Sequence, residues 1–504
     1  IDVPFFMTDL QSNDKVAAET YRDGIKIDVS KYPNAKPQFS PRFGFNYKPF
    51  DDENGSLQIR GGTGLFTGTP PYVWISNQAG NNGVLFGDLN VRAVKDKNDN
   101  IISDGRPSLG FTGNMDTYKP AEGSATRSDI AITDPDFKYP SLWKSNIAAD
   151  YKFGDGWVAT VELLYSKDIN AIYHDNIGLY RTEQFVNDGG AGNARPYYNG
   201  YYSDREGNQK AANHVVMLRN TSKGHSLYTT FQLQKNFVDG ILKGLYLNGS
   251  YSFGQSRGVT DGTSSVATSA WKYRAALDGN AEEVGYTAGS FDGRLLLSAS
   301  YTANWSKYAA TSFGLIYQRY RPFRYSYCYN GDANGDSQFS NDLMYIPANF
   351  DEVKDHLLPG DFDSQEDAWK AMNAFIEQDP YLSKHRGEYA ERNGAVAPFA
   401  NQLDLSVSHD IKIYQKNGRS HTLRFSFNIA NFLNLLNRNW GVVQTTVLGN
   451  QQYQFLTIPK GQGPSAANNY TLKYTMAKDL DETFKDNLND VSRWQMQFGI
   501  KYIF

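Results

Sequence analysis

Apolar and polar residues alternate with a period of two in many segments of this chain, which is the pattern of β-strands whose two faces meet different surroundings. In the last segment, apolar side chains occupy every second position from Trp494 to Phe504. Ten more segments alternate near residues 43–49, 56–66, 142–153, 157–166, 225–236, 244–253, 294–304, 309–321, 403–412 and 422–429. We therefore expect about eleven strands, several of them at or beyond the roughly 9 to 11 residues with which a tilted strand crosses a bilayer.

The connections between these segments are of two kinds. Short polar turns at 51–55, 154–156, 304–307 and 415–420 alternate with long excursions near 68–140, 174–223, 254–290, 322–400 and 434–492. A soluble β-sandwich has no reason to place every long loop at one end. Outer-membrane barrels do this, because they pair short periplasmic turns with longer extracellular loops. The alternation predicts an all-β, transmembrane antiparallel β-barrel.

One segment in a long excursion has a helical pattern. Ser364 precedes a run that contains Trp369, Met372 and Phe375 at helical spacing, and Asp367 occupies the capping-box position. We expect a short helix in an extracellular loop.

The composition narrows the class of protein further. The 504 residues include 34 Tyr, 30 Phe and 45 Gly but one cysteine, Cys328, so an internal disulfide is excluded. The mean hydropathy is −0.57, and no apolar run approaches the roughly 20 residues of a membrane-spanning helix. The net charge is only −4, and no basic block is present, so nucleic acid is not an expected partner.

Several stretches resemble a known family. SPRFGFNY at 40–47, QIRGGTGLFTGTPPYVWISNQAGN at 58–81, YLSKHRGEYAERNG at 381–394 and FNIANFLNLLN at 427–437 resemble the barrel of Oar-like TonB-dependent receptors of Bacteroidetes. The terminal strand that ends in Phe504 resembles the signal read by the barrel-assembly machinery. The resemblance implies a 22-stranded barrel in the outer membrane of a Gram-negative bacterium. It also implies an N-terminal plug and a drive from the inner-membrane TonB complex. A surface lipoprotein that caps the barrel is a candidate partner that the sequence does not decide.

The chain departs from that plan in its number of strands. Eleven strands are about half of such a barrel, and neither a plug-like segment nor a TonB box precedes the first strand near Phe43. A half barrel would leave unpaired strand edges in lipid. We therefore expect residues 1–504 to be the C-terminal part of a longer receptor, with an independent smaller barrel as the alternative.

An acidic segment in one long excursion suggests a structural calcium site. Oxygen-bearing side chains occupy alternate positions, as they do in calcium loops, although Ser337 stands where such loops usually have Gly, and Leu343 where they have Glu. The alternative is a solvated loop whose side chains bond to their own backbone. The candidate ligands are Asp332, Asn334, Asp336, Asn341 and Asp342.

Aromatic residues in the long excursions are candidates for stacking on a ligand. They can equally form the interfacial aromatic girdle of a barrel or pack the loops together. The candidates are Tyr72, Trp74, Tyr197, Tyr198, Tyr201, Tyr202 and Trp271.

Other candidate motifs have simpler interpretations. Gly61, Gly62, Gly64 and Gly68 lack the Lys-Ser or Lys-Thr of a phosphate loop, so we expect a strand in which glycine permits sharp curvature or a close approach. The seven His residues show no zinc-site spacing, and no nucleophile with a base is recognisable. We expect neither an enzyme nor an organic cofactor.

Taken together, the sequence predicts a receptor whose extracellular loops bind a nutrient, peptide or glycan and which admits that ligand to the periplasm. A non-transporting adhesin or structural barrel is the alternative, and a plug domain with a TonB box in the complete gene would distinguish the two. An outer-membrane enzyme, the third class, would need an acid, base or nucleophile pair that converges in the lumen.

Overall fold

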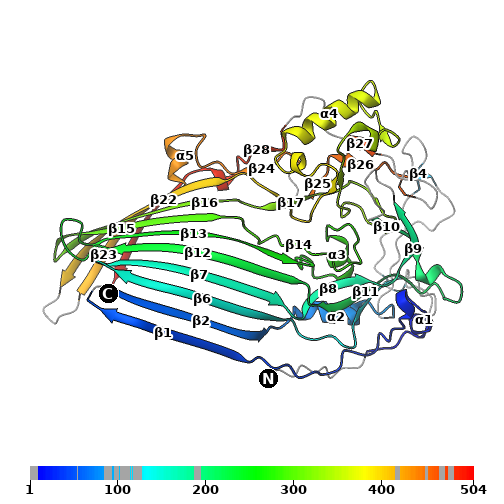
Figure 1. The fold of residues 1–504 in the computed structure, drawn as a ribbon, viewed down its shortest axis with the longest axis horizontal. Helices are drawn as coiled ribbons and strands as arrows, with labels where there is room; N and C mark the ends of the chain where they lie inside the picture. Colours follow the sequence, from blue (N-terminus) through cyan, green and yellow to red (C-terminus); the bar gives the residue numbers. More distant parts are fainter. Residues whose placement is uncertain are drawn as a thin grey trace.

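A single twisted antiparallel sheet is the largest sheet of the structure (Figure 1). The computed structural model describes residues 10–53, 55–84, 94–95, 101–102, 114, 116, 128–186, 195–414, 420–448, 452–461, 463–464, 472–474 and 482–504. The long strands pair in the order in which they follow one another along the chain. They are β1 (Arg42–Asp52), β2 (Gly55–Thr67), β6 (Ser141–Phe153), β7 (Trp157–Asp168), β12 (Gly224–Asn236), β13 (Leu245–Gly258), β15 (Arg294–Ser306), β16 (Ala309–Tyr320), β22 (Ala400–Tyr414), β23 (Ser420–Ala430) and β29 (Gln495–Ile503).

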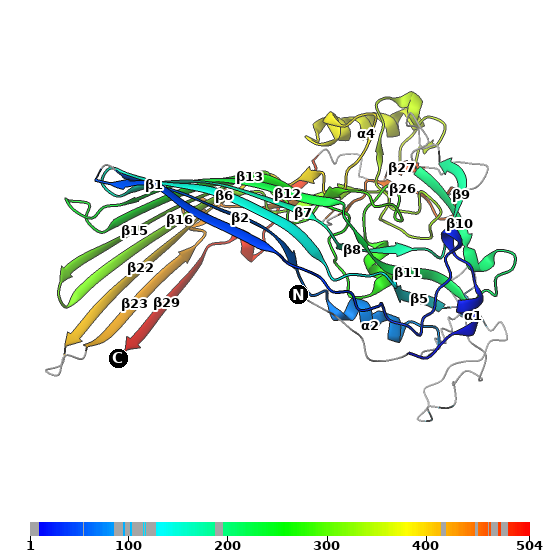
Figure 2. The ribbon, with the colours of Figure 1, turned by 60° about the horizontal axis from the view of Figure 1, so that its bottom comes forward.

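All eleven strands expected from the alternating pattern are present, and this confirms the expected all-β antiparallel fold. The sheet curves but does not close: β1 pairs with β2, β29 pairs with β23, and in the described part of the chain neither end strand has a second neighbour (Figure 2). The two outer edges therefore present backbone N–H and C=O groups that a lipid environment cannot satisfy.

One face of the sheet carries apolar side chains that are exposed rather than packed inside the protein. Residues paired across neighbouring strands form continuous apolar stripes, such as Phe313, Val407, Phe427 and Phe498. Three of these four side chains are more than a third exposed. An apolar surface of this extent has lipid as its natural solvent.

Aromatic residues gather on this face near the short turns. Tyr151 stacks on Phe153, which stacks on Trp157, and Tyr502 stacks on Phe504. Such rings are enriched at the level of the lipid headgroups, where an apolar body meets a polar boundary. The short-turn end therefore has an aromatic girdle.

Glycine allows a close approach in the first hairpin, as expected. A Cβ atom built on Gly61 would lie 2.7 Å from the carbonyl oxygen of Asn146 and 2.8 Å from the ring of Phe45. Gly61 is paired with Phe45 in the adjacent strand, so its missing side chain leaves room for that ring. At Gly68 nothing lies within 4 Å, so close packing does not explain this residue.

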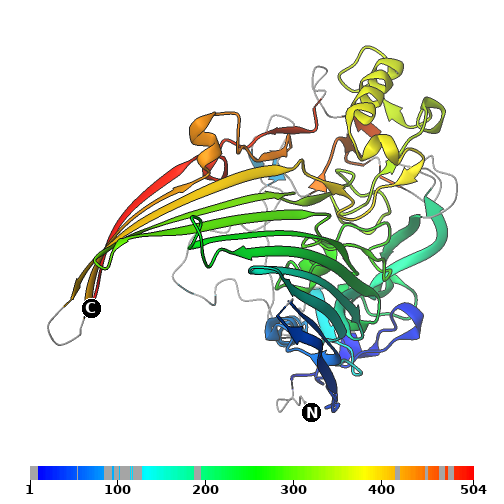
Figure 3. The same cartoon turned by 60° about the vertical axis from the view of Figure 1, so that its left-hand side comes forward.

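The long connections all leave the sheet at the end opposite the short turns and fold into a compact body (Figure 3). We call this body the cap. It comprises the described parts of 10–41, 68–140, 169–223, 259–293, 321–399 and 431–494. Its helices are α1 (Asp14–Ala18), α2 (Tyr72–Gly80), α3 (Ala267–Lys272), α4 (Gln365–Gln378) and α5 (Phe432–Leu436), with short 3-10 turns at Arg22–Gly24, Tyr202–Asp204, Phe350–Glu352, Leu382–Lys384 and Asp490–Ser492.

Small sheets connect the cap segments. Their strands are β3 (Val94–Lys95), β4 (Ile101–Ile102), β5 (Ser128–Thr133), β8 (Ala171–Asn176), β9 (Leu179–Val186), β10 (Arg195–Tyr201), β11 (Ala212–Thr221), β17 (Arg324–Tyr327), β18 (Tyr345–Ile346), β19 (Leu357–Leu358), β20 (Glu388–Tyr389), β21 (Ala395–Val396), β24 (Gln444–Thr446), β25 (Gln452–Tyr453), β26 (Leu456–Thr457), β27 (Leu472–Tyr474) and β28 (Phe484–Asp486). A further short strand, β14 (Gly285–Tyr286), pairs with the end of β13 and so attaches the cap to the large sheet.

The cap has apolar cores of its own. The largest core surrounds the buried rings of Tyr325, Tyr327, Phe375 and Tyr453. Helix α4 packs Phe375 into this core and begins as expected, because the Ser364 side chain accepts a hydrogen bond from the backbone N–H of Asp367. The cap is therefore a folded body rather than a set of solvated loops.

The segment before the first strand also belongs to the cap. Val16, Tyr21 and Val29 are buried in a second core against residues of β5 and β11. The buried carboxylate of Glu19 accepts hydrogen bonds from the hydroxyl of Tyr21 and the backbone N–H of Ala211. No helix in the described residues is long and apolar enough to cross a membrane.

Candidate functional site

The second face of the large sheet is polar, and hydrogen bonds link its side chains across neighbouring strands. Arg424 donates two hydrogen bonds to Asp410, at 2.6 and 2.8 Å, and Arg60 donates one to Asp150 at 2.8 Å. Gln318 donates to the side-chain oxygen of Gln402 at 3.0 Å. Pairs of this kind recur along the sheet, so the polar face is a wall of donors and acceptors.

This polar wall is hollowed on its surface. A groove of about 440 Å³ lies over β15, β16, β22 and β23, and its polar lining includes Ser298, Ser300, Ser406 and Asn428. These residues belong to the polar set of their strands, since Ser300 is paired with Gly314, and Ser406 with both Gly314 and Asn428. The groove therefore lies on the polar face of the sheet, and its lining also includes Leu315, Leu405 and Ile429.

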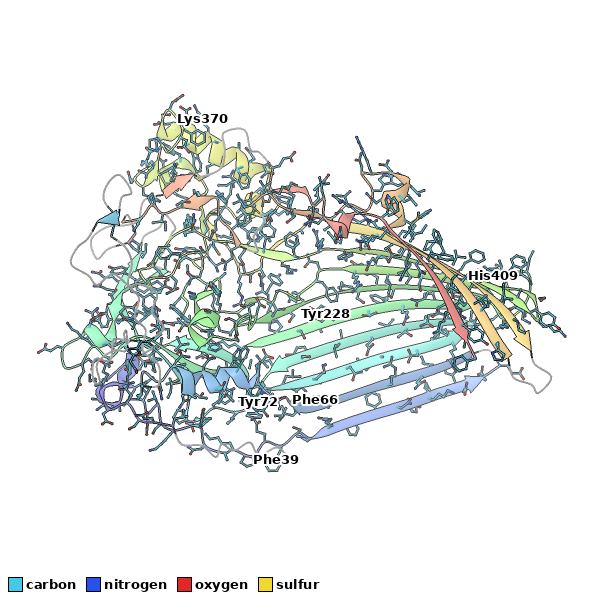
Figure 4. All side chains as sticks on the ribbon, turned by 180° about the vertical axis from the view of Figure 1, so that it is seen from behind. Phe39, Phe66, Tyr72, Tyr228, Lys370 and His409 are labelled. Carbon is cyan, nitrogen blue, oxygen red and sulfur yellow. The ribbon has the colours of Figure 1, made fainter. Side chains whose placement is uncertain are left out.

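The candidate aromatic residues occupy different environments in the cap. Tyr72 is exposed, and Figure 4 shows it where the sheet meets the cap, whereas His409 lies toward the other end of the sheet. Trp74 is half-buried, and its indole N–H donates to the backbone carbonyl of Ser264 at 2.8 Å. Ligand contact by Tyr72 stays a prediction.

The other aromatic candidates pack the cap. Trp271 is 1% exposed and donates to the carbonyl of Gly279, and Tyr198 is buried with its hydroxyl 2.7 Å from Asp278. Tyr197 is buried as well. These three side chains support the second interpretation of the aromatic residues, which is packing of the loops.

The last two candidates, Tyr201 and Tyr202, are half-buried against other rings. The ring of Tyr201 meets His214 edge-on at 5.2 Å, and that of Tyr202 meets Tyr180 at 5.3 Å. Their first role is therefore also packing within the cap.

The acidic segment forms a tight loop at the edge of the cap core. Both carboxylate oxygens of Asp332 accept backbone N–H groups, one from Gly335 at 2.6 Å and the other from Ser337 at 2.8 Å. Ser337 has a φ of 66°, the left-handed conformation that calcium loops usually assign to glycine at this position. The loop therefore has the turn of a calcium loop despite the unusual residue.

The remaining candidate ligands are buried in the same region. Asp342 is paired with the buried guanidinium of Arg195 at 3.1 Å and accepts the N–H of Ala333 at 2.8 Å. Burial, together with the neighbouring charges of Asp342 and Asp332, holds the pKa of Asp336 well above its usual value.

A calcium ion at this loop stays a prediction. Backbone bonds to Asx side chains, the alternative interpretation, are present: Asn334 accepts the N–H of Asp336 at 2.9 Å. In the residues that the structure describes, no three His, Cys, Asp or Glu side chains are grouped to hold a metal ion. A calcium site here would therefore also need amide or backbone oxygens, such as the side-chain oxygen of Asn341, which is buried without a hydrogen-bond partner.

A polar cavity that the sequence analysis missed lies inside the cap. Its volume is about 520 Å³, within the range of small-molecule sites. Segments far apart in the chain supply its walls: Asp261 and Arg274 come from the connection after β13, Ser326 from β17, and Arg392 and Asn393 from the connection before β22. No motif marks these residues, because their spacing becomes meaningful only when the cap folds.

A comparison with protein-family models agrees with the architecture. The family model described as "Outer membrane beta barrel domain" matches residues 6–465. Among curated proteins, none matches the chain. The outer membrane transporter YddB from Escherichia coli is 10% identical, with 94% of this chain and 41% of that chain covered and a TM-score of 0.39.

Two further solved structures have similar values. A mutant of the ferric enterobactin receptor PfeA from Pseudomonas aeruginosa is 9% identical, with 92% of this chain and 40% of that chain covered and a TM-score of 0.37. The FrpB iron transporter from Neisseria meningitidis is 7% identical, with 77% and 38% covered and a TM-score of 0.28. The chain thus spans about two fifths of the length of these structures.

Proposed function

Because this chain belongs to the outer-membrane β-barrel domain family, we propose that it is the C-terminal part of a TonB-dependent receptor of the Oar-like type found in Bacteroidetes. In this proposal the cap binds a ligand outside the cell, and the protein then admits it to the periplasm. Energy would come from the TonB complex through a region N-terminal to this chain. A surface lipoprotein would be a further partner on the cap side.

The observation that carries this proposal is the continuous polar face of the sheet. Its hydrogen-bonded side chains lead from the cap toward the short turns, and the groove of about 440 Å³ lies on the same face. In a closed barrel that face would line the lumen, and the apolar stripes would face lipid. A wet path beneath a folded cap suits a receptor that passes its ligand inward.

Closure of the barrel requires strands beyond the eleven seen here. The free edges of β1 and β29 would each need a partner strand, because unpaired backbone groups in lipid cost several kcal/mol each. We propose that strands encoded N-terminal to this chain join the two edges, which also leaves room in the lumen for a plug.

Uptake can be tested before the ligand is identified. Cells with and without the gene are grown in the same medium, and the compounds that disappear from it are compared. We expect at least one compound to be removed only by cells that carry the full-length protein, and its removal to stop when a protonophore collapses the inner-membrane gradient. An adhesin predicts identical depletion in both strains, and that result would refute transport.

We propose no covalent catalysis. If the protein were instead an enzyme of the outer membrane, a chemically changed product would accumulate outside the cells and would continue to form in the presence of the protonophore. The same depletion experiment therefore separates the receptor from this third class of function.

A further inference from the structure

The polar cavity in the cap is built around two buried arginines. Arg274 and Arg392 are each about 5% exposed or less, and both line the cavity of about 520 Å³. Arg274 lies just after α3, and Arg392 lies more than one hundred residues further along the chain. Burial of a charged group is costly unless partners compensate it, so two such groups at one cavity need an explanation.

Backbone carbonyls hold both guanidinium groups in place. Arg274 donates to the carbonyls of Val259 at 3.3 Å and Ala281 at 2.9 Å. Arg392 donates to the carbonyls of Gly258 and of the same Val259. The two cations therefore converge on one carbonyl oxygen, and the geometry of the connection after β13 depends on both.

These bonds leave the two groups incompletely satisfied. The Nε–H group of Arg274 and that of Arg392 are both buried without an acceptor. In the described part of the chain neither guanidinium has a carboxylate within salt-bridge distance. Native structures seldom leave buried donors unpaired, and each such donor needs an explanation, such as a bound water or ion.

Charges of both signs act on the buried Arg392. Burial is the largest cause and lowers its pKa to about 10; the charge of Asp261 raises this pKa, that of Arg274 lowers it, and those of Glu283 and Glu391 raise it. Asp261 also lines the cavity, but its two oxygens accept hydrogen bonds from the N–H of Ala288 and the amide of Asn393, both at 2.9 Å. The lining thus has two cations against one anion whose oxygens are already bonded.

The wall also contains unusual backbone. Asn393 has a φ of 52° and Ser340 a φ of 85°, both in the left-handed region that side chains other than glycine seldom adopt. Asn393 is fixed there by bonds from its amide to Asp261 and to the carbonyl of Tyr286. Strained residues held by their surroundings gather at binding sites.

From these contacts we infer that the cavity binds a small organic anion through a carboxylate or phosphate group, which Arg274 and Arg392 recognise. The anion places a negative charge beside two cations whose hydrogen bonds, in the described residues, all run to neutral backbone carbonyls. Arginine is suited to this role, because its planar donors match the oxygens of carboxylates and phosphates. This inference deepens the proposed receptor function, since it names the chemistry of the ligand that the cap holds.

Binding can be tested directly on the full-length protein in detergent micelles by isothermal titration calorimetry. The probes are glucose 6-phosphate, glucuronate and inorganic phosphate, with uncharged glucose as the matched control. We expect at least one anion to bind about tenfold or more tightly than glucose, because hydrogen bonds to a charged group contribute that much. Glucuronate and glucose 6-phosphate separate a carboxylate from a phosphate preference.

Two variants locate the site, and a third serves as a control. Arg392→Gln removes one cation, and Thr263→Trp fills the cavity from an exposed lining position without disturbing a buried group. Arg386→Gln removes the same charge from a cap arginine outside the cavity, where it donates to the side chain of Asn373. Anion binding should fall at least about tenfold in the first two variants and stay unchanged in the third.

The inference is overturned if no anion binds more tightly than glucose, or if Thr263→Trp and Arg392→Gln both leave anion binding unchanged. Should Arg392→Gln fail to fold, Thr263→Trp alone decides the outcome. Because binding is measured on purified protein, it can succeed while uptake by cells fails, and the reverse, so the cavity and the transport function are tested separately.

Discussion

A charge placed on the lipid face of the sheet should destabilise this protein far more than the same charge placed one residue away. Phe231 lies in β12 and is paired with Val161 of β7 and Tyr251 of β13. The exposed fractions of these side chains are 47%, 43% and 46%. Phe231 stands five residues before the last residue of β12 at the short-turn end, which places it near mid-bilayer for a tilted strand.

The expected loss of folding free energy follows from the cost of placing a charge in lipid. Arginine on the lipid face of a barrel costs about 2 to 4 kcal/mol at the bilayer midplane, which is about 30- to 700-fold in the folding equilibrium. Gln232, the next residue, lies on the polar face and donates to the side chain of Asn248 at 2.7 Å. Gln232→Arg should therefore cost less than about 1 kcal/mol, the order of one hydrogen bond.

The assay is reversible urea unfolding of the full-length protein in phospholipid vesicles, followed by tryptophan fluorescence. Phe231→Arg and Gln232→Arg are compared with the unchanged protein at the same lipid ratio. If the two variants lost equal free energy of unfolding, or if Gln232→Arg lost more, the assignment of the apolar face to lipid would be wrong.

Three further predictions concern the cap. Asp379 accepts hydrogen bonds from the Tyr327 hydroxyl at 2.7 Å and from three other donors. Asp379→Ala should therefore destabilise the cap by about 3 to 5 kcal/mol. Limited proteolysis should then cleave the cap faster while the barrel stays intact. Burial lowers the pKa of His174 from its usual value of 6.5 to about 4. As the pH falls between these two values, the unfolded chain binds a proton that the folded chain does not, so the folded state loses stability. The cap should lose up to about 3 kcal/mol across that window, and His174→Gln should flatten the pH dependence of thermal unfolding. If the acidic loop binds calcium, bound Tb³⁺ should luminesce when tyrosine is excited, and Asp336→Asn should abolish this signal. Asp361→Asn is the control, because the exposed carboxylate of Asp361 pairs with a lysine, and it should keep the signal. Equal signals from the two variants would refute the site.

The amino-acid sequence by itself determined the strands and their two faces. A strand places successive side chains on opposite sides, so the alternation in β12, β23 and β29 specified both the strand and the face that meets lipid. The helix that follows Ser364 was equally predictable from the sequence, because a capping residue and helical spacing are local signals. The asymmetry of short turns and long connections required only the order of segments along the chain.

The cap could not be predicted in the same way. Trp271 and Tyr198 were candidates for ligand contact, yet tertiary packing buries both, since an aromatic residue in a long connection has the same local pattern whether it faces solvent or a core. No local pattern in the sequence marked Arg274 and Arg392 as candidates for ligand binding. Their meaning depends on a shared carbonyl at Val259 and on a cavity between distant segments, and only the folded chain brings these together.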